Sequence, residues 1–108
     1  MKEEISGFDW DQGNQIKCQK HGLTIAEIEA LFDGQVLIAP DIKHSDQEQR
    51  YLAIGRSTIV GKPMFVAFTL RIKAERIFIR PISARYMHQR EITKYEQTFT
   101  THEDGSGD

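Results

Sequence analysis

The sequence predicts an α+β domain with a four-stranded antiparallel sheet, two helices before the sheet and one helix after it. Apolar residues recur at helical spacing in residues 11–32 and again in residues 84–97. Residues 36–83 instead contain runs of β-branched and aromatic residues that alternate with period two. The links between these runs are short, which favours a meander because parallel neighbours need long crossovers. Such a sheet would carry its helices against one face.

The two N-terminal helices are predicted from their ends as well as from their periodicity. Residues 8–10 are expected to form a short strand or an extended arm. We expect the first helix over residues 11–21, followed by Gly22, a residue suited to the position after a helix. The second is expected over residues 25–32, and the segment Thr24-Ile25-Ala26-Glu27 has the pattern of a capping box.

Four strands are expected next, over residues 36–39, 49–57, 64–72 and 76–83. Pro81 lacks the amide hydrogen that a sheet ladder needs, so the last strand should end there or lie at an edge. The face left open by the helices is expected to hold Phe65, Thr69, Arg71, Phe78 and Arg80. Aromatic side chains between arginines suit stacking on bases and neutralising phosphates.

A third helix is expected over residues 84–97, with Ser83 as its N-cap. The polar tail 98–108 is expected to be disordered, so that residues 1–97 form a single domain. No apolar run approaches the roughly 20 residues of a membrane span, and the N-terminus lacks the apolar stretch of a secretory signal. The single cysteine, Cys18, cannot form an internal disulfide. We therefore expect a cytoplasmic protein without a membrane partner.

Charge is strongly segregated along the chain, although the net charge is only −2. Residues 50–90 hold nine Lys and Arg residues against one acid, whereas residues 1–49 and 91–108 carry net charges of −6 and −4. A basic middle within a nearly neutral chain predicts a local anionic partner rather than a generally cationic protein. The alternative is a solvated sheet face whose basic side chains protect strand edges from pairing.

Lys20 and His21 stand directly before the glycine that is expected to follow the first helix. In one interpretation, both cations complement the negative end of the helix dipole. In the other, Lys20 stabilises a phosphate and His21 transfers a proton, since the imidazole of histidine titrates near neutrality. The residues alone leave both interpretations open.

Arginines occur where the predicted strands end. Arg56 follows Gly55 near the end of one strand, and Arg80 and Arg85 flank the junction between the last strand and the last helix. A guanidinium group binds phosphate through paired hydrogen bonds, and a helix N-terminus beside it strengthens an anion site. Each arginine alone fits an ordinary surface position, but three at neighbouring strand ends favour an anion site.

No metal or cofactor is expected. The residues that most often bind transition metals are scattered and lack the spacing of a known site: Cys18, His21, His44, His88 and His102. The sequence also lacks a nucleophile elbow, a phosphate-binding loop and a dinucleotide fingerprint.

Taken in order, the polar motifs resemble the BrnT family of toxin–antitoxin proteins over residues 8–97. No single motif is specific, but their order and spacing together are typical of the family. The principal matching segments are Phe8-x-Trp10-Asp11, Lys20-His21-Gly22, His44-Ser45, Ile54-Gly55-Arg56-Ser57, Ile82-Ser83-Ala84-Arg85 and Glu91-x-x-x-Tyr95.

The resemblance implies a fold similar to the RelE ribonucleases and an RNA-cleaving toxin that slows translation. It implies a BrnA-type antitoxin whose ribbon-helix-helix domain represses the operon, so that operator DNA is contacted only through the antitoxin. By position, the family's polar motifs place the expected catalytic residues at Lys20, His21, Arg56 and Arg85. The expected RNA-binding residues are Arg50, Arg71, Phe78, Arg80 and His88.

The resulting hypothesis is a metal-independent endoribonuclease in which a ribose 2′-hydroxyl attacks the adjacent phosphate and leaves a 2′,3′-cyclic phosphate. His21 would act as general base or acid, while Lys20, Arg56 and Arg85 offset the charge on the phosphate oxygens. Two alternatives remain. One is a catalytically inactive toxin-like binding module that acts with its antitoxin in transcriptional autoregulation. The other is an interaction domain whose basic face pairs with an acidic partner protein.

Overall fold

The computed structural model describes residues 4–44 and 47–97. The predicted disordered tail, His102 and Ser45 of the His44-Ser45 motif lie outside the described residues. Five strands form one sheet in the order β1-β5-β4-β3-β2. Their bounds are β1 (Ile5–Phe8), β2 (Val36–Pro40), β3 (Tyr51–Arg56), β4 (Pro63–Lys73) and β5 (Arg76–Tyr86). A short 3₁₀ helix, η2 (Ile42–His44), follows β2. The α+β class is therefore confirmed.

The expected antiparallel meander is present in β2 to β5, where every neighbouring pair runs antiparallel. The expectation of four strands is wrong, because β1 adds a fifth strand that runs parallel to β5. This strand is only four residues long, and Ile5 pairs with Ile77 far along the chain. The short strand or arm predicted at residues 8–10 overlaps β1 only at Phe8, because so short a segment with a distant partner has too little periodicity to place a strand.

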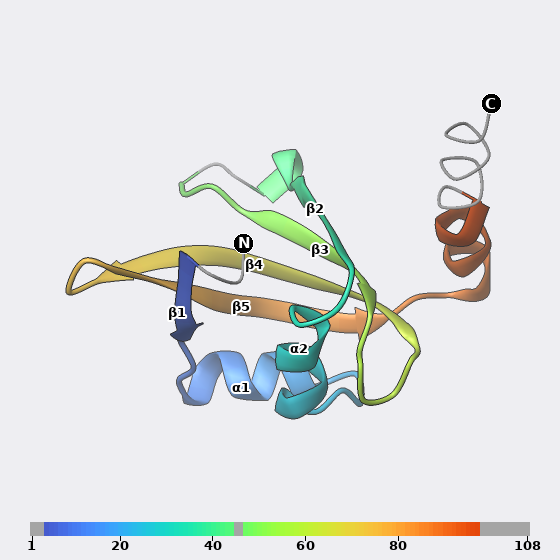
Figure 1. Cartoon of the computed structure of the whole chain (residues 1–108), viewed down its shortest axis with the longest axis horizontal. Helices are drawn as coiled ribbons and strands as arrows, with labels where there is room; N and C mark the ends of the chain where they lie inside the picture. Colours follow the sequence, from blue (N-terminus) through green and yellow to red (C-terminus); the bar gives the residue numbers. More distant parts are fainter. Residues whose placement is uncertain (1–3, 45–46, 98–108) are drawn as a thin grey trace.

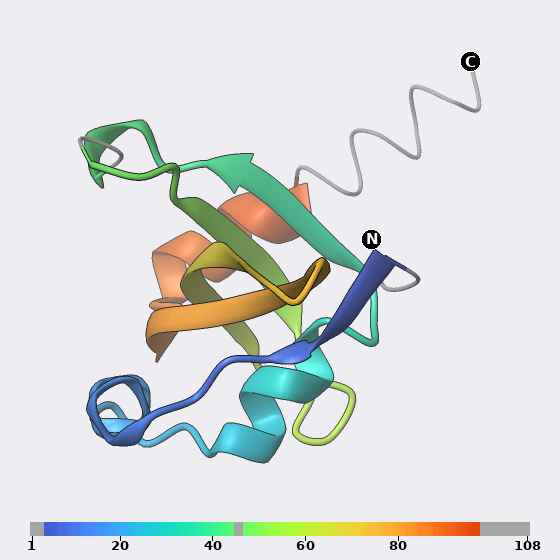
Figure 2. The same ribbon diagram turned by 90° about the vertical axis from the view of Figure 1, so that its left-hand side faces the viewer.

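Helix α1 (Gln12–Gln19) begins at Asp11, whose carboxylate accepts from the Asn14 amide while the Asn14 side chain accepts from the Asp11 amide. Helix α2 (Ile25–Leu31) begins at Thr24, which accepts from the Glu27 amide. Half of the predicted capping box is thus present, since the Glu27 carboxylate accepts from the Thr24 hydroxyl and from Tyr86 in β5 and not from the Thr24 amide. Both helices lie on one side of the sheet (Figures 1 and 2).

The last helix begins at residue 89 and is described through residue 97. The predicted start at residue 84 is wrong, because β5 continues to Tyr86 and Ala84 pairs with Val66 of β4. Ser83 is therefore a strand residue and not an N-cap. Figure 1 places this helix beyond the ends of β5 and β3, apart from α1 and α2, so the expectation that all three helices cover one face is also wrong.

Pro81 lies inside β5 and not at its end. The register between β4 and β5 shifts there, since Ala67 pairs with Ser83 whereas Phe68 pairs with Pro81. One extra residue, Ile82, therefore stands in β5. A bulge interrupts the ladder, which is one of the positions where a sheet tolerates proline.

The two faces of the sheet differ in chemistry. On the helix-covered face, Met64, Val66 and Phe68 of β4 are fully buried and pack with Leu31 of α2 in the main core. The strand register places the alternate residues on the opposite face, here called the arginine face. It includes Leu52, Ile54, Arg56, Phe65, Ala67, Thr69, Arg71, Phe78, Arg80, Ser83 and Arg85. All five residues predicted for this face are present on it.

Replacing Tyr86 by phenylalanine is expected to lower the free energy of unfolding by about 1–3 kcal/mol, because Glu27 is only 8% exposed and loses a hydrogen-bond donor. The contact to Glu27 and burial raise the pKa of Tyr86 to about 12. The stabilisation from the Tyr86–Glu27 hydrogen bond should therefore be complete below the ordinary tyrosine pKa of about 10 and disappear as the pH rises to about 12.

Urea titrations between pH 7 and pH 11 measure this effect. The difference between wild type and Tyr86→Phe should be constant up to about pH 9 and should shrink above it. Tyr51→Phe removes a hydroxyl outside this contact and is the matched control, with an expected change within about 0.5 kcal/mol. A Tyr86→Phe variant as stable as the control would contradict the assigned contact.

Candidate functional site

A pocket of about 360 Å³ opens on the arginine face, where the end of α1 meets the middle of the sheet. We call it the His21–Arg85 pocket. It is lined by His21, Leu52, Phe65, Ala67, Ser83, Ala84 and Arg85. Its floor is largely apolar, and its two titratable or charged groups are the imidazole and the guanidinium. Two of the four predicted catalytic residues, distant in sequence, therefore lie at one pocket.

The end of α1 positions His21. Cys18 is buried in the core, and the Asn14 side chain donates to the Pro81 carbonyl of β5 at 2.9 Å, so α1 is held along this strand. Lys20 is the C-cap, and Gly22 adopts a φ of 95°, which turns the chain away from the helix. His21 stands between these residues and is exposed. The turn after α1 therefore presents the imidazole to solvent beside the sheet.

Arg85 is held by contacts with three groups. Its Nη1 and Nη2 atoms donate to the two carboxylate oxygens of Glu91, each at 2.9 Å, and Nη1 also donates to the Tyr86 carbonyl at 3.2 Å. The guanidinium carbon lies 4.6 Å from the centre of the Phe65 ring. The arginine side chain remains 41% exposed. Arg85 is thus oriented on three sides while it still faces the pocket.

Glu91 belongs to the last helix and links it to β5. Its carboxylate also accepts from the His88 amide at 2.8 Å, which caps the first turn of that helix. The hydrogen bond from Arg85, followed by the one from His88, lowers the pKa of Glu91 to about 2. The same pairing raises the pKa of Arg85. Both groups are therefore charged throughout the physiological pH range.

Lys20 and Arg56 are not among the residues that line the pocket. Lys20 is exposed next to His21. Arg56 stands at the end of β3, where it donates to the Gly61 carbonyl at 2.8 Å and to Glu96 of the last helix at 2.7 Å. Both side chains of the Arg56–Glu96 pair are largely exposed, at 42% and 56%. The predicted catalytic set is therefore brought together only in part.

A second hollow, the Arg80 hollow, lies further along the arginine face and contains three of the predicted RNA-binding arginines. Its lining includes Arg50, Arg71, Arg80, Lys17, Asp11 and Glu48. Arg80 donates to Asp11 at 2.7 Å and to Asp9 at 3.4 Å, and Arg71 pairs with Glu48. The Asn14 amide and then Arg80 lower the pKa of Asp11. Four cations against two carboxylates make the lining of this hollow net positive.

The two remaining predicted RNA-binding residues lie outside both hollows. Phe78 is half-buried in β5 between Gly7 of β1 and Arg71 of β4. His88 is exposed and precedes the last helix. The register places Phe78 and Arg80 on the same face, but the lining of the Arg80 hollow includes Arg80 and not Phe78.

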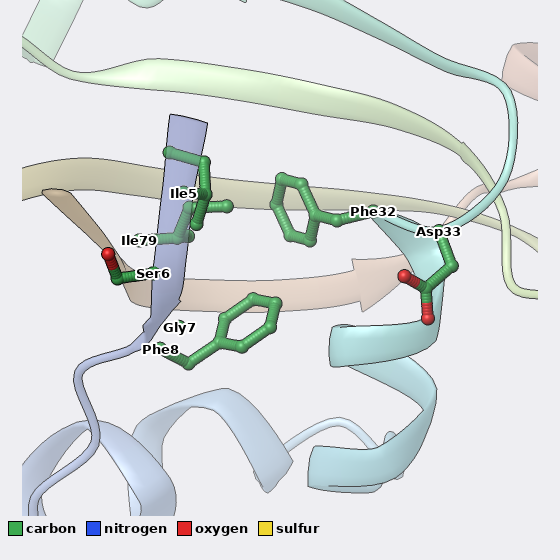
Figure 3. Close-up of a pocket in the computed structure, with 7 residues that line it drawn as sticks. All are labelled: Ile5, Ser6, Gly7, Phe8, Phe32, Asp33 and Ile79. Carbon is green, nitrogen blue, oxygen red and sulfur yellow. The ribbon is translucent and has the colours of Figure 1, made fainter. Parts of the chain in front are cut away.

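A third pocket lies beside β1 and is mainly apolar (Figure 3). Ile5, Phe8, Phe32 and Ile79 surround it, and the Phe8 and Phe32 rings are 5.7 Å apart. Asp33 is the one charged residue in its lining. None of the predicted catalytic residues contributes to it. Its chemistry does not suit a phosphodiester.

Within residues 4–44 and 47–97, no three His, Cys, Asp or Glu side chains are grouped closely enough to hold a metal ion. In the same part of the chain, no helix has the length and apolar character needed to cross a membrane. Cys18 is buried, and desolvation raises the pKa of its thiol to about 11, so it is a core residue and not a nucleophile.

The sequence prediction missed the carboxylates that pair with the arginines. Arg56, Arg71, Arg80 and Arg85 each form an ion pair with an acid from the N-terminal or C-terminal part of the chain. Acids from the two terminal segments thus pair with arginines of the basic segment within one chain. These intramolecular ion pairs argue against the alternative in which the basic face binds an acidic partner protein. Among these acids, Glu91 was singled out in the sequence only as part of the Glu91-x-x-x-Tyr95 segment, and the predicted N-cap at Ser83 gave no reason to expect its contact with Arg85.

Comparison with known protein families gives an independent result. The family described as the ribonuclease toxin BrnT of type II toxin–antitoxin systems matches residues 10–91, which is most of the chain. This range contains His21, Arg56, Arg85 and Glu91. No individually curated protein matches the chain. A type II system pairs its toxin with an antitoxin, and a ribonuclease toxin acts on RNA. The chain therefore belongs to the BrnT family of ribonuclease toxins of type II toxin–antitoxin systems.

Proposed function

We propose that this chain is an active endoribonuclease that cuts RNA at the His21–Arg85 pocket without a metal ion. The observation that supports this most strongly is that an exposed imidazole and an oriented guanidinium line the same pocket. One group can move a proton, and the other can stabilise charge on a phosphate. These are the two kinds of chemistry that phosphodiester cleavage by a neighbouring hydroxyl requires.

In the proposed reaction, the ribose 2′-oxygen bonds to the adjacent phosphorus and the bond from phosphorus to the 5′-oxygen breaks. The proton of the 2′-hydroxyl leaves to a base, and the 5′-oxygen gains a proton, which gives a 2′,3′-cyclic phosphate and a free 5′-hydroxyl. His21 carries out one of these proton transfers and water the other. Arg85 binds the nonbridging oxygens, where negative charge builds up.

We assign Lys20 and Arg56 supporting roles as cations that offset phosphate charge beside the pocket. Lys20 adjoins His21 in sequence, and Arg56 pairs with the same helix as Arg85. Arg56 would reach a phosphate only if its exposed contact to Glu96 opens. Because exposed ion pairs contribute at most about 1 kcal/mol, that opening costs little.

The RNA strand would continue from the pocket to the Arg80 hollow. Phe65 pairs with Arg85 and Thr69 pairs with Arg80, so the two arginines are separated by four residues of β4, roughly 14 Å. Arg50 and Arg71 also line this hollow. Phe78 and His88 lie outside the lining of this hollow, so we do not place them on the path of the RNA strand. This arrangement would give binding that weakens as salt concentration rises.

The proposed biological setting is a cytoplasmic toxin that inhibits translation. A BrnA-type antitoxin with a ribbon-helix-helix domain would neutralise it, and the pair would contact operator DNA through the antitoxin. The alternative is a toxin-like domain that binds its antitoxin and has lost catalysis. One observation favours that alternative: Arg56, Arg71, Arg80 and Arg85 all have carboxylate partners.

Incubation of the purified chain with end-labelled RNA in the presence of EDTA distinguishes the two functions. Active cleavage predicts fragments that end in a 2′,3′-cyclic phosphate, recognised by mass spectrometry, and growth arrest on expression without the antitoxin. An inactive binding module predicts salt-sensitive RNA or antitoxin binding and intact RNA. Cleavage that occurs only after Mg²⁺ is added would contradict the metal-independent reaction.

A further inference from the structure

Arg85 has more hydrogen-bond donors than its contacts with Glu91 and Tyr86 use. A guanidinium group has five N–H bonds, one on Nε and two on each Nη atom. Nη1 donates to Glu91 and to the Tyr86 carbonyl, which uses both of its hydrogens. Nη2 donates to the other oxygen of Glu91. Among the described residues, no acceptor is present for the Nε hydrogen or for the second Nη2 hydrogen of Arg85.

These two remaining hydrogens form a pair. In arginine, Nη2 lies on the same side of the Nε–Cζ bond as the Nε hydrogen, so the two N–H bonds point in parallel along one edge of the planar group. Two parallel donors match two oxygens of a phosphate group. Glu91 therefore uses the end of the guanidinium, and a second edge with the same geometry remains for a different anion.

Several contacts determine where that edge points. The guanidinium carbon lies over the Phe65 ring, and Glu91 restrains the rotation of the guanidinium group through two hydrogen bonds. Glu91 is itself fixed at the start of the last helix by the His88 amide. The Glu91 side chain is 31% exposed, less than Arg85 itself. Arg85 is thus oriented before any ligand arrives.

We infer that Glu91 is a positioning residue, which holds Arg85 so that its Nε–Nη2 edge binds the scissile phosphate in the His21–Arg85 pocket. This inference rests on the proposed function for the reaction but concerns a different residue. It assigns Glu91 and the phosphate to separate edges of one guanidinium, so both are bound at once. The opposite view, in which Glu91 masks Arg85 and phosphate must displace it, requires the two anions to share one edge.

The contrast with Arg56 supports this assignment. The Arg56–Glu96 pair has one hydrogen bond, and Glu96 is 56% exposed. The Arg85–Glu91 pair has two hydrogen bonds, and Glu91 also caps its helix. Of these two pairs, the Arg85–Glu91 pair has the two parallel hydrogen bonds that fix a guanidinium plane.

Glu91→Gln tests the inference with little change in shape. The glutamine oxygen can still accept from the His88 amide, since glutamine serves in capping boxes as glutamate does. Its amide NH₂ group would face an Arg85 donor, so the paired contact is lost. We expect kcat for RNA cleavage to fall about 10²-fold through misplacement of the guanidinium. KM should stay equal or decrease, because a negative charge beside the RNA is removed.

Glu75→Gln, in the exposed hairpin between β4 and β5, is the matched control and should leave both constants unchanged. If Glu91 masks Arg85, Glu91→Gln should raise kcat/KM, and this result would overturn the inference. A purely structural role would reduce kcat only in proportion to the fraction of folded enzyme, measured by circular dichroism, and would equally overturn it.

A binding measurement separates failure of this inference from failure of the proposed function. An RNA oligonucleotide with 2′-deoxy nucleotides cannot be cut by the proposed reaction. Its addition should shift the ¹⁵N–¹H resonance of Arg85 Nε in the wild-type protein, and the shift should be reduced in Glu91→Gln. If the wild type shows this shift without cutting ordinary RNA, the proposed function fails, and what stands is that Glu91 positions Arg85 to bind an RNA phosphate. If RNA is cut but Arg85 Nε does not respond, the inference fails alone.

Discussion

Replacing Arg85 by alanine is expected to lower the rate of RNA cleavage by about 10²–10³-fold, the usual cost of losing one positioned donor to a developing charge. The guanidinium lines the pocket with His21, and its orientation is fixed by Glu91 and Phe65. Initial rates with a labelled RNA measure the effect directly. Expression of the variant without the antitoxin should no longer arrest growth.

Two further variants show whether orientation or charge is responsible. Arg85→Lys keeps one positive charge but lacks a planar group with paired donors, so most of the activity should still be lost. Arg76→Ala removes an exposed arginine at the opposite end of β5 and should cleave RNA at the wild-type rate. Normal cleavage by Arg85→Ala, in protein with a wild-type circular dichroism spectrum, would contradict the assigned site.

Replacing His21 by alanine is expected to slow cleavage by about 10²–10⁴-fold, which is the range for a lost proton-transfer group. The residue is exposed after α1 and is not part of the buried core, so its removal should leave the fold intact. The pH–rate profile should also lose the limb that a titrating imidazole contributes. Rates measured from pH 5 to pH 9 for both proteins test this.

His21→Gln is the sharper variant, because an amide keeps hydrogen-bonding capacity but cannot exchange a proton near neutral pH. It should be as inactive as His21→Ala. Gln19→Ala, an exposed change at the end of the same helix, is the control for effects on α1 and should keep full activity. An unchanged pH–rate profile in His21→Gln would assign proton transfer to another group.

The sequence predicted the parts of the fold that depend on local periodicity. Residues 64–72 alternate strongly, and β4 spans Pro63–Lys73 with the expected faces. The end of β5 was mispredicted because Ala84 and Met87 fit a helical spacing equally well. Pairing with β4 makes residues 84–86 part of a strand. Such pairing is a tertiary contact, which local propensity does not include. Strand β1 covers Ile5–Phe8, whereas a short strand or extended arm was predicted at residues 8–10, and its partner β5 is again a tertiary contact.

The spatial arrangement of the predicted site residues was anticipated only in part. His21 and Arg85 were expected in one groove and line one pocket, whereas Arg56 contacts the last helix outside the lining of that pocket. The contacts of Glu91 and Phe65 with Arg85 could not be predicted, because their atoms meet only after β4, β5 and the last helix have packed. The sequence shows where the arginines and carboxylates stand along the chain, but it does not show which of them form ion pairs in the fold.

The most direct measurement of the whole proposal is the position of RNA on the folded chain, mapped by amide chemical shifts with an uncleavable 2′-deoxy-substituted oligonucleotide. Binding at the proposed site predicts the largest shifts at Phe65, Ser83 and Arg85, with smaller shifts toward Thr69 and Arg80. Shifts confined to the apolar pocket beside β1, or spread evenly over the surface, would contradict a catalytic groove on the arginine face.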